Sequence, residues 1–176
     1  MAQKMATLGG GSFWSTEAVF QQVRGVRNVV PGYSGGYVQF PTYEDICEGN
    51  TGHAEVVRFE FDTDVVSFRE LLGVFFAIHD PTSLDRQGND IGTRYRSVIY
   101  FHDAEQQAVA NQLMREVANR WNAPIVTELT AAPAFYPAED YHHNFYKLNS
   151  HQAYCAQVVA PKIEQARRYL VSACVP

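Results

Sequence analysis

Apolar and polar residues alternate most regularly in the segment His53–Phe61, and this period of two residues predicts a half-buried β-strand. Shorter apolar runs, bounded by glycine, proline or polar residues, predict further strands elsewhere in the chain. These further strand predictions are Met5–Leu8, Val26–Val30, Ser97–Phe101 and Ile125–Leu129. The candidate strands are therefore spread over most of the sequence.

Helical spacing of apolar residues recurs between the candidate strands. The first predicted helix begins near Ser12 or Phe13 and ends near Val23, where a glycine supplies a stop. Ser67 is a candidate N-cap for a second helix, which ends near Ile78. The other two predicted helices run from Asp103 to about Arg120 and from Ala160 to Leu170.

Three stretches rich in turn-forming or aromatic residues show no clear period, namely 31–51, 85–95 and 137–146. Because about twenty residues without a period are unusual inside a compact domain, we expect functional loops here. The strand-helix-strand units in tandem predict an α+β fold. Its architecture is a two-layer α/β sandwich with a ferredoxin-like core, a mainly antiparallel sheet and long irregular loops.

The composition is typical of one folded domain with a well-buried core. Of the 176 residues, 46% are hydrophobic and 19% are charged, which argues against disorder. We therefore expect residues 1–176 to form a single domain. The net charge of −5 and the lack of any run of Lys or Arg disfavour binding to nucleic acid or to a membrane surface.

The sequence also bears on the compartment. No stretch reaches the roughly 18 apolar residues of a membrane span, and the first residues lack the apolar core of a signal peptide. The three cysteines, Cys47, Cys155 and Cys174, form no CxxC pair and no even-numbered framework. These observations predict a reducing compartment, with the cytoplasm as the default location. Ser12 and Ser15 have the spacing of a CxxC motif.

The segment GGGSFW places Ser12 after a glycine turn and at the start of the first predicted helix. Glycines let the backbone turn tightly and approach a ligand closely. The N–H groups and positive dipole end of a helix N-terminus lower the pKa of a thiol but leave a serine hydroxyl a poor nucleophile. The segment therefore suits a thiol at position 12, but the residue there carries a hydroxyl. The alternative interpretation is that Ser12 is simply an N-cap.

Glu55 lies at the start of the best strand prediction. Among apolar neighbours its carboxyl group is desolvated, which raises its pKa and allows it to act as a general acid. The alternative is a glutamate at a strand edge that points to water. His53 and Glu55 also form an H-x-E motif, but the P-C-x-x-C half of a zinc deaminase signature is absent, which disfavours a metal site.

Further candidate residues lie in the irregular stretches. The hydroxyl of Tyr43 is a potential donor to an oxyanion, and Asp90 lies in a glycine turn five residues before Tyr95, where local hydrogen bonding is the competing explanation. The adjacent histidines at 142 and 143 point in different directions on a helix, so we interpret them as part of a hydrogen-bonded, partly exposed segment. A free cysteine such as Cys155 is most often a small buried hydrophobe.

The motifs GGGSFW, GYSGG, PTYEDIC, GNTGHAEVV, HDPTS, RQGNDIGTRYRSVIY, FYPAEDYHHNFY and AYC occur in an order that resembles the type A peptide methionine sulfoxide reductases. The resemblance spans roughly Ala6–Ala160. It implies reduction of the S epimer of methionine sulfoxide, free or in proteins, by a cysteine nucleophile in G-C-F-W and without a metal or organic cofactor. In this chain Ser12 stands at the position of that cysteine.

The resemblance also implies roles for individual residues. The apolar wall for the methyl group of the substrate would be formed by Phe13 and Trp14. The donors to the sulfoxide oxygen would be Tyr43, Glu55 and Tyr95. Asp90 would complete the polar side of the pocket. Cys155 matches the resolving cysteine, which attacks the sulfenic acid to form a disulfide that thioredoxin then reduces. Cys47 matches a cysteine that takes no part in this disulfide exchange. Ser15 matches a position that is often glycine and sometimes cysteine.

The serine at position 12 predicts that reductase activity is lost while the sulfoxide pocket is kept. Serine cannot pass through a sulfenic acid, so the cycle has no first step. One alternative is a non-catalytic module that binds oxidised methionine. A second alternative, a serine hydrolase, is disfavoured because the G-x-S-x-G motif is missing and no histidine is placed by the sequence to act as its base.

Overall fold

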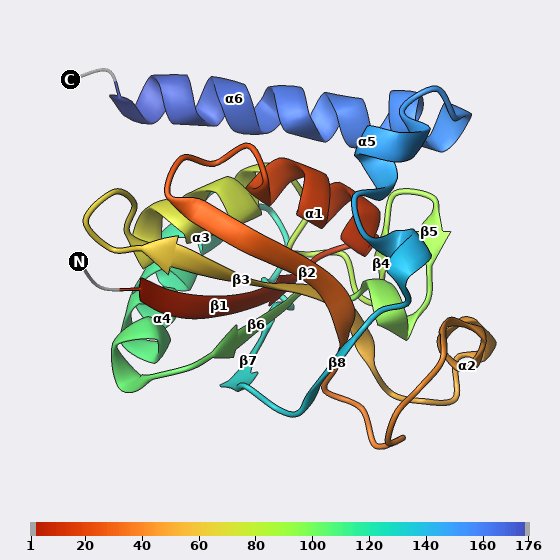
Figure 1. The fold of residues 1–176 in the computed structure, drawn as a ribbon. Helices are drawn as coiled ribbons and strands as arrows, with labels where there is room; N and C mark the ends of the chain where they lie inside the picture. The colour runs from red at the N-terminus through yellow and green to blue at the C-terminus, as the bar shows by residue number, and fades with distance from the viewer. Residues whose placement is uncertain (1–2, 175–176) are drawn as a thin grey trace.

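The computed structural model describes the backbone of residues 3–174 and the side chains of residues 3–171. Within this range a main sheet has the strand order β7-β6-β1-β3-β2-β8 (Figure 1). Its strands are β1 (Gln3–Gly9), β2 (Val26–Ser34), β3 (Ala54–Asp62), β6 (Val98–Phe101), β7 (Glu128–Ala131) and β8 (Phe135–Pro137). A separate short hairpin pairs β4 (Arg86–Gln87) with β5 (Asp90–Ile91).

The chain order of the core elements confirms the predicted α+β fold. β1, α1 (Phe13–Phe20), β2 and β3 are followed by α3 (Phe68–Ala77) and β6, and the four strands take the order β6-β1-β3-β2 with antiparallel neighbours. This is the βαββαβ arrangement of ferredoxin-like folds. Among the described strands, β6 and β7 form the one parallel pair.

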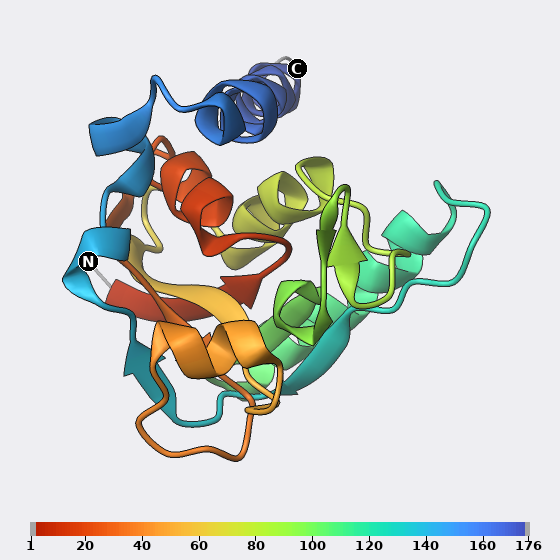
Figure 2. The ribbon, with the colours of Figure 1, turned by 90° about the vertical axis from the view of Figure 1, so that its right-hand side faces the viewer.

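Helices cover one face of this sheet. α1 and α3 share a hydrophobic core with β1 and β3, and α4 (Ala104–Ala118) packs beside α3 and against β6. α6 (Ala160–Cys174) lies across α1 and α3 on the side away from the sheet (Figures 1 and 2). The apolar side chains of this core alternate along β3, where Val57, Phe59 and Phe61 all face the helices.

Local capping explains where the predicted helices begin. Ser67 accepts a hydrogen bond from the Glu70 N–H and forms a capping box with it, and Asp103 caps α4 through the Gln106 N–H. Both starts are confirmed. α1 ends at Phe20 and α4 at Ala118, a few residues before the predicted ends.

Part of the stretch 31–51 is regular, contrary to the prediction. β2 continues through Pro31 to Ser34. Proline lacks an N–H donor, but its carbonyl still accepts a hydrogen bond from Ala138, and the pairing with β8 begins at the next residue. The strand therefore tolerates this proline. A second regular element, α2 (Tyr43–Glu48), follows Thr42, which forms a capping box with Asp45.

The last third of the chain differs most from the prediction. β7 begins at Glu128, three residues after the predicted start, and the stretch 137–146 holds the end of β8, a 3-10 turn at Asp140–His142 and the start of α5 (Phe145–Asn149). A π-helical turn at Cys155–Val159 leads into α6. No helix in the described part of the chain has the length and apolar character to cross a membrane.

Candidate active site

A cavity of about 150 Å³ opens at the N-terminus of α1, and we call it the Ser12 cavity. Its lining comes from six separate segments of the chain: the start of α1, the start of α2, the start of β3, the β4–β5 hairpin, the 3-10 turn after it and the residue before the π-helical turn. The lining residues are Ser12, Phe13, Trp14, Tyr43, Glu55, Asp90, Tyr95 and Tyr154. All of them except Tyr154 are residues that the sequence singled out.

Ser12 is both the N-cap of α1 and part of the cavity wall. Gly11 turns the chain with φ +81°, a backbone conformation that favours glycine. The Ser12 Oγ accepts a hydrogen bond from the Trp14 N–H at 3.2 Å, and the residue is only 5% exposed. The N-cap interpretation is therefore confirmed, and it coexists with a position in the site. The side-chain atom at this position therefore accepts from an N–H that has no partner within the helix, at the positive end of the α1 dipole.

Glu55 is buried, so the interpretation of a carboxylate that points to water is wrong. The alternation along β3 places it on the same face as Val57 and Phe59, under the N-terminus of α1. Burial raises its pKa to about 7, while a hydrogen bond from the Phe13 N–H at 3.1 Å and the Arg94 guanidinium, 3.9 Å away, favour the ionised form. The group is therefore placed to hold or release a proton near neutral pH.

Two aromatic rings form a fixed apolar wall. The Trp14 indole stacks on Phe145 with ring centroids 3.8 Å apart, and its N–H donates to His142 Nδ1 at 2.9 Å. Phe13 contacts the rings of Tyr33 and His142. Because these rings are held on several sides, the wall is in place before any ligand arrives.

The two adjacent histidines have different surroundings. His142, which we expected to be partly exposed, is 1% exposed, because the rings of Trp14 and Phe13 cover it. His143 is half-buried, and its Nε2 forms a hydrogen bond with the Ala138 carbonyl. The prediction of a hydrogen-bonded, partly exposed segment is therefore confirmed for His143.

Tyr43 and Tyr95 both line the cavity, and their hydroxyls are potential hydrogen-bond donors there. Burial raises the pKa of Tyr43 and of Tyr95, so both stay protonated at neutral pH. Glu139 fixes the start of α2 by accepting hydrogen bonds from the Tyr43 N–H at 2.7 Å and from the Tyr33 hydroxyl at 2.9 Å. The Arg94 guanidinium lies 4.6 Å from the centre of the Tyr95 ring.

Tyr154 is a site residue that sequence reasoning missed. Its hydroxyl donates to Asp90 Oδ2 at 2.6 Å and so joins the β4–β5 hairpin to the segment before α6. Asp90 is therefore more than a local turn former. One of ten tyrosines carries no distinguishing mark in the sequence, and the separation of 64 residues hides the contact.

The cysteines lie outside the cavity lining. Cys155 is fully buried in the hydrophobic core, and burial raises the pKa of its thiol, so its interpretation as a buried hydrophobe is confirmed. Its neighbour Tyr154 reaches the cavity. Cys47 is exposed, and the side chain of Cys174 lies outside the described residues. Ser15 is 1% exposed, and its hydroxyl has no hydrogen-bond partner in the part of the chain described.

The histidines near the site have structural partners. His53 Nδ1 accepts from the Gly36 N–H at 3.0 Å, and Nε2 lies 2.7 Å from the Val38 carbonyl, so the ring anchors the loop after β2. None of the described residues lining the Ser12 cavity is a histidine. Ser12 therefore has no imidazole base beside it of the kind that a serine hydrolase needs.

A comparison with protein families identifies the family of this chain. The family model described as peptide methionine sulfoxide reductase matches residues 4–173. This chain belongs to that family. Members of the reductase family are oxidoreductases that act on sulfur-containing groups. The resemblance seen in the sequence motifs is thereby confirmed.

Named relatives extend the match to whole proteins. The peptide methionine sulfoxide reductase MsrA of Saccharolobus solfataricus is 54% identical over 162 residues, which cover 92% of this chain and 92% of that protein. An MsrA of Thermus thermophilus is 49% identical over 176 residues and covers both chains completely.

Solved structures show the same fold. Mxr1 from Saccharomyces cerevisiae in reduced form superposes with a TM-score of 0.82 at 31% identity, covering 87% of this chain and 89% of that one. Mxr1 in complex with Trx2 gives a TM-score of 0.58 at 26% identity, covering 81% and 84%.

The surroundings of Glu55 predict a titration near pH 7. Infrared difference spectra should lose the protonated carboxyl band of Glu55 as the pH rises through about 7, and Glu55→Gln should remove that band. A titration at or below the ordinary glutamate value of 4.5 would contradict this expectation.

The same shift has a consequence for stability. Between pH 4.5 and about 7 the unfolded chain loses the Glu55 proton first, so the unfolded state binds fewer protons than the folded state. The free energy of unfolding therefore decreases with rising pH across this window. Glu55→Gln should remove that part of the slope in urea titrations, and an unchanged slope would argue against a buried, protonated Glu55.

Proposed function

We propose that the Ser12 cavity binds the S-sulfoxide of methionine, free or in peptides and proteins, and that this chain as written holds the ligand without reducing it. The observation that carries the proposal is the convergence of an apolar wall and several proton donors on Ser12, in a chain that belongs to the reductase family.

The shape and polarity of the cavity support a specific orientation of the ligand. The rings of Phe13 and Trp14 take the methyl group, which has no polar contact to make. The hydroxyls of Tyr43 and Tyr95 and the protonated Glu55 donate to the sulfoxide oxygen. With its oxygen and methyl group bound on opposite sides, the sulfoxide sulfur faces residue 12. Such a three-point arrangement distinguishes the S epimer from the R epimer.

A thiol at position 12 has a balanced route to methionine. The thiolate attacks the sulfoxide sulfur and forms a sulfur–sulfur bond, while Glu55 supplies a proton to the oxygen. The oxygen then moves to the enzyme sulfur, and both its bond to the substrate sulfur and the sulfur–sulfur bond break. The products are methionine and a sulfenic acid, so one sulfur is reduced and the other oxidised. The Trp14 N–H and the α1 dipole favour the starting thiolate.

The Ser12 hydroxyl has no equivalent route. To accept the sulfoxide oxygen, serine would have to form an oxygen–oxygen bond, and its hydroxyl is not ionised at neutral pH even at a helix N-terminus. We therefore propose that reductase activity is absent while the binding residues remain. With serine at position 12, the chain then acts as a binder of oxidised methionine.

With cysteine at position 12, we propose that Cys155 resolves the sulfenic acid and that thioredoxin reduces the resulting disulfide. The complex of Mxr1 with Trx2 supports thioredoxin as the reductant. A disulfide brings two Cβ atoms to about 3.5–4.5 Å, and Cys155 is fully buried outside the cavity lining. We propose that the segment around the π-helical turn rearranges to bring Cys155 to residue 12 before the disulfide forms.

We also propose that residues 1–176 form one reductase domain that works in the cytoplasm. The family match over residues 4–173 supports the single domain. Free thiols at Cys47 and Cys155 are compatible with a reducing compartment.

The Ser12 form should produce no methionine from a peptide that carries methionine S-sulfoxide, with either dithiothreitol or thioredoxin as reductant. Ser12→Cys should restore methionine formation, measured by chromatography, because it supplies the missing nucleophile. Ser15→Cys is the matched control and should stay inactive, since Ser15 does not line the cavity. Activity of the Ser12 form, or none in Ser12→Cys, would defeat the proposal.

The role of Cys155 is testable in the Ser12→Cys background. Without reductant, Ser12→Cys should form one methionine per chain and a disulfide. Adding Cys155→Ser should still allow one methionine but leave a sulfenic acid that a dimedone-type reagent traps, and thioredoxin-driven turnover should fall to near background. Cys47→Ser serves as the control with unchanged turnover. A disulfide in the Cys155→Ser variant would refute the assignment.

Binding by the Ser12 form should raise its thermal stability. At a peptide concentration of about 100 times Kd, the stabilisation is about 2.7 kcal/mol, which for a domain of this size is a Tm increase of roughly 5–10 °C. The S-sulfoxide peptide should produce the shift, and the unoxidised peptide should not. Trp14→Ala should abolish it and the exposed Val171→Ala should keep it. Equal shifts with both peptides would contradict recognition of the sulfoxide.

A further inference from the structure

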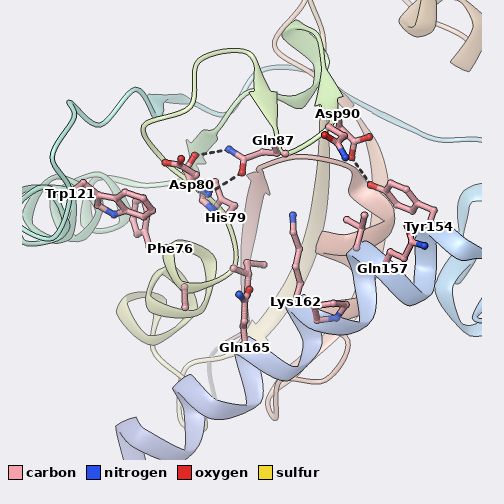
Figure 3. A pocket seen from close by; sticks show the side chains of 16 residues that line it. Phe76, His79, Asp80, Gln87, Asp90, Trp121, Tyr154, Gln157, Lys162 and Gln165 are labelled. Carbon is pink, nitrogen blue, oxygen red and sulfur yellow. Dashed lines mark hydrogen bonds between the residues drawn. The ribbon is translucent and has the colours of Figure 1, made fainter.

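A second and larger cavity, of about 620 Å³, adjoins the Ser12 cavity, and we call it the Lys162 cavity (Figure 3). The two cavities share Asp90 and Tyr154 in their linings. The hydrogen bond between these side chains therefore lies in the wall that both cavities have in common. The two cavities are therefore neighbours, with this pair of side chains between them.

Lys162 extends from α6 into this cavity (Figure 3). Its ammonium group makes no hydrogen bond and no ion pair within the described residues. A Cβ built on Gly11 would lie 3.4 Å from the Lys162 Nζ, so the charge sits next to the residue that precedes Ser12. Burial lowers the pKa of this amine, and Asp90 partly offsets that effect. The cation is thus partly desolvated and close to the site.

The other charged or titratable groups around this cavity are already engaged. Asp80 Oδ1 accepts from the Thr82 N–H and hydroxyl, and Asp90 Oδ2 accepts from Tyr154. His79 is neutral at physiological pH because burial lowers its pKa to about 4, and both of its ring nitrogens have partners. Among the described residues that line the cavity, Lys162 is therefore the charged side chain left without a direct partner.

The rest of the lining suits a polypeptide rather than a small ion. Phe76 and Trp121 form an apolar side, with Trp121 36% exposed. The amides of Gln157 and Gln165, on the α6 side, have no hydrogen-bond partner in the described part of the chain and lie at the solvent-facing edge. Amide groups of this kind pair with a peptide backbone, and the volume exceeds what one side chain fills.

We propose that the Lys162 cavity binds the stretch of substrate polypeptide next to the methionine sulfoxide, and that Lys162 selects an acidic side chain in that stretch. This inference rests on the proposed function of the Ser12 cavity. A partly buried, unpaired ammonium gains most from a carboxylate, because a charge-assisted hydrogen bond replaces part of the water that burial removed. An extended chain advances about 3.3–3.6 Å per residue, so the acid lies within a few residues of the sulfoxide.

The test uses the full chain with Ser12, which holds its ligand without turnover. The ligands are nine-residue blocked peptides with a central methionine S-sulfoxide and one Glu at each of the three positions on either side, paired with the matching Gln peptides. Calorimetry should show that at least one Glu peptide binds about tenfold more tightly than its Gln match, as expected for a hydrogen bond to a charged group.

Substitutions at Lys162 decide whether this side chain is the cause. Lys162→Met should bring the Glu-to-Gln affinity ratio to about one and leave the affinity of the Gln peptide unchanged, whereas Lys162→Arg should keep a preference for Glu. Arg167→Met is the matched control, because Arg167 is an exposed cation on the same helix outside the cavity. Thermal unfolding of each variant establishes that it is folded.

The outcomes separate this proposal from the one on which it rests. If no sulfoxide peptide binds, the proposed function fails and this inference with it. If sulfoxide peptides bind but every Glu and Gln pair binds equally, or if Arg167→Met lowers the ratio as much as Lys162→Met, only the inference is overturned. The inference is also overturned if Lys162→Met keeps the peptide ratio but slows thioredoxin-driven turnover in the Ser12→Cys background, which would assign the cavity to the reductant.

Discussion

The site depends on one contact, the hydrogen bond from the Phe13 N–H to the Glu55 carboxyl group. It joins the first residue of α1 to the start of β3 and brings a buried acid against a helix N-terminus. Burial favours the protonated acid and the helix end favours the anion. The balance of these opposing effects keeps the carboxyl group near its point of titration. The pairing of β1 with β3 already brings these two segments together, and this contact fixes the carboxyl group of Glu55 against the start of α1.

The remaining groups reach the site through loops that are tied down individually. Glu139 holds the start of α2 and with it Tyr43, while the Asp90–Tyr154 hydrogen bond holds the β4–β5 hairpin. Trp14 is fixed by stacking on Phe145 and by its bond to His142. Each anchor joins segments that are distant in sequence. The rigid sheet supplies Glu55, and the loops supply the variable polar and aromatic groups around it.

Local signals in the sequence carried much of the fold, and the family resemblance carried most of the site. The alternation in β3 and the capping residues Ser67 and Asp103 predicted elements that exist, because their causes act within a few residues. α2 was missed although Thr42 and Asp45 carry its capping box. Tyr154 and Lys162 were beyond prediction, since only the packing of α6 over α1 and α3 brings them to the site. The burial of His142 likewise comes from rings that lie far away in the chain.

The side chains of Asp90 and Tyr154 belong to the walls of both cavities. Ligand groups that occupy the two cavities therefore contact the same two side chains. Their contributions to affinity are then non-additive, as for any neighbours with a common partner. A fragment that fills one space alone therefore gives an incomplete measure of what a longer molecule gains by spanning both.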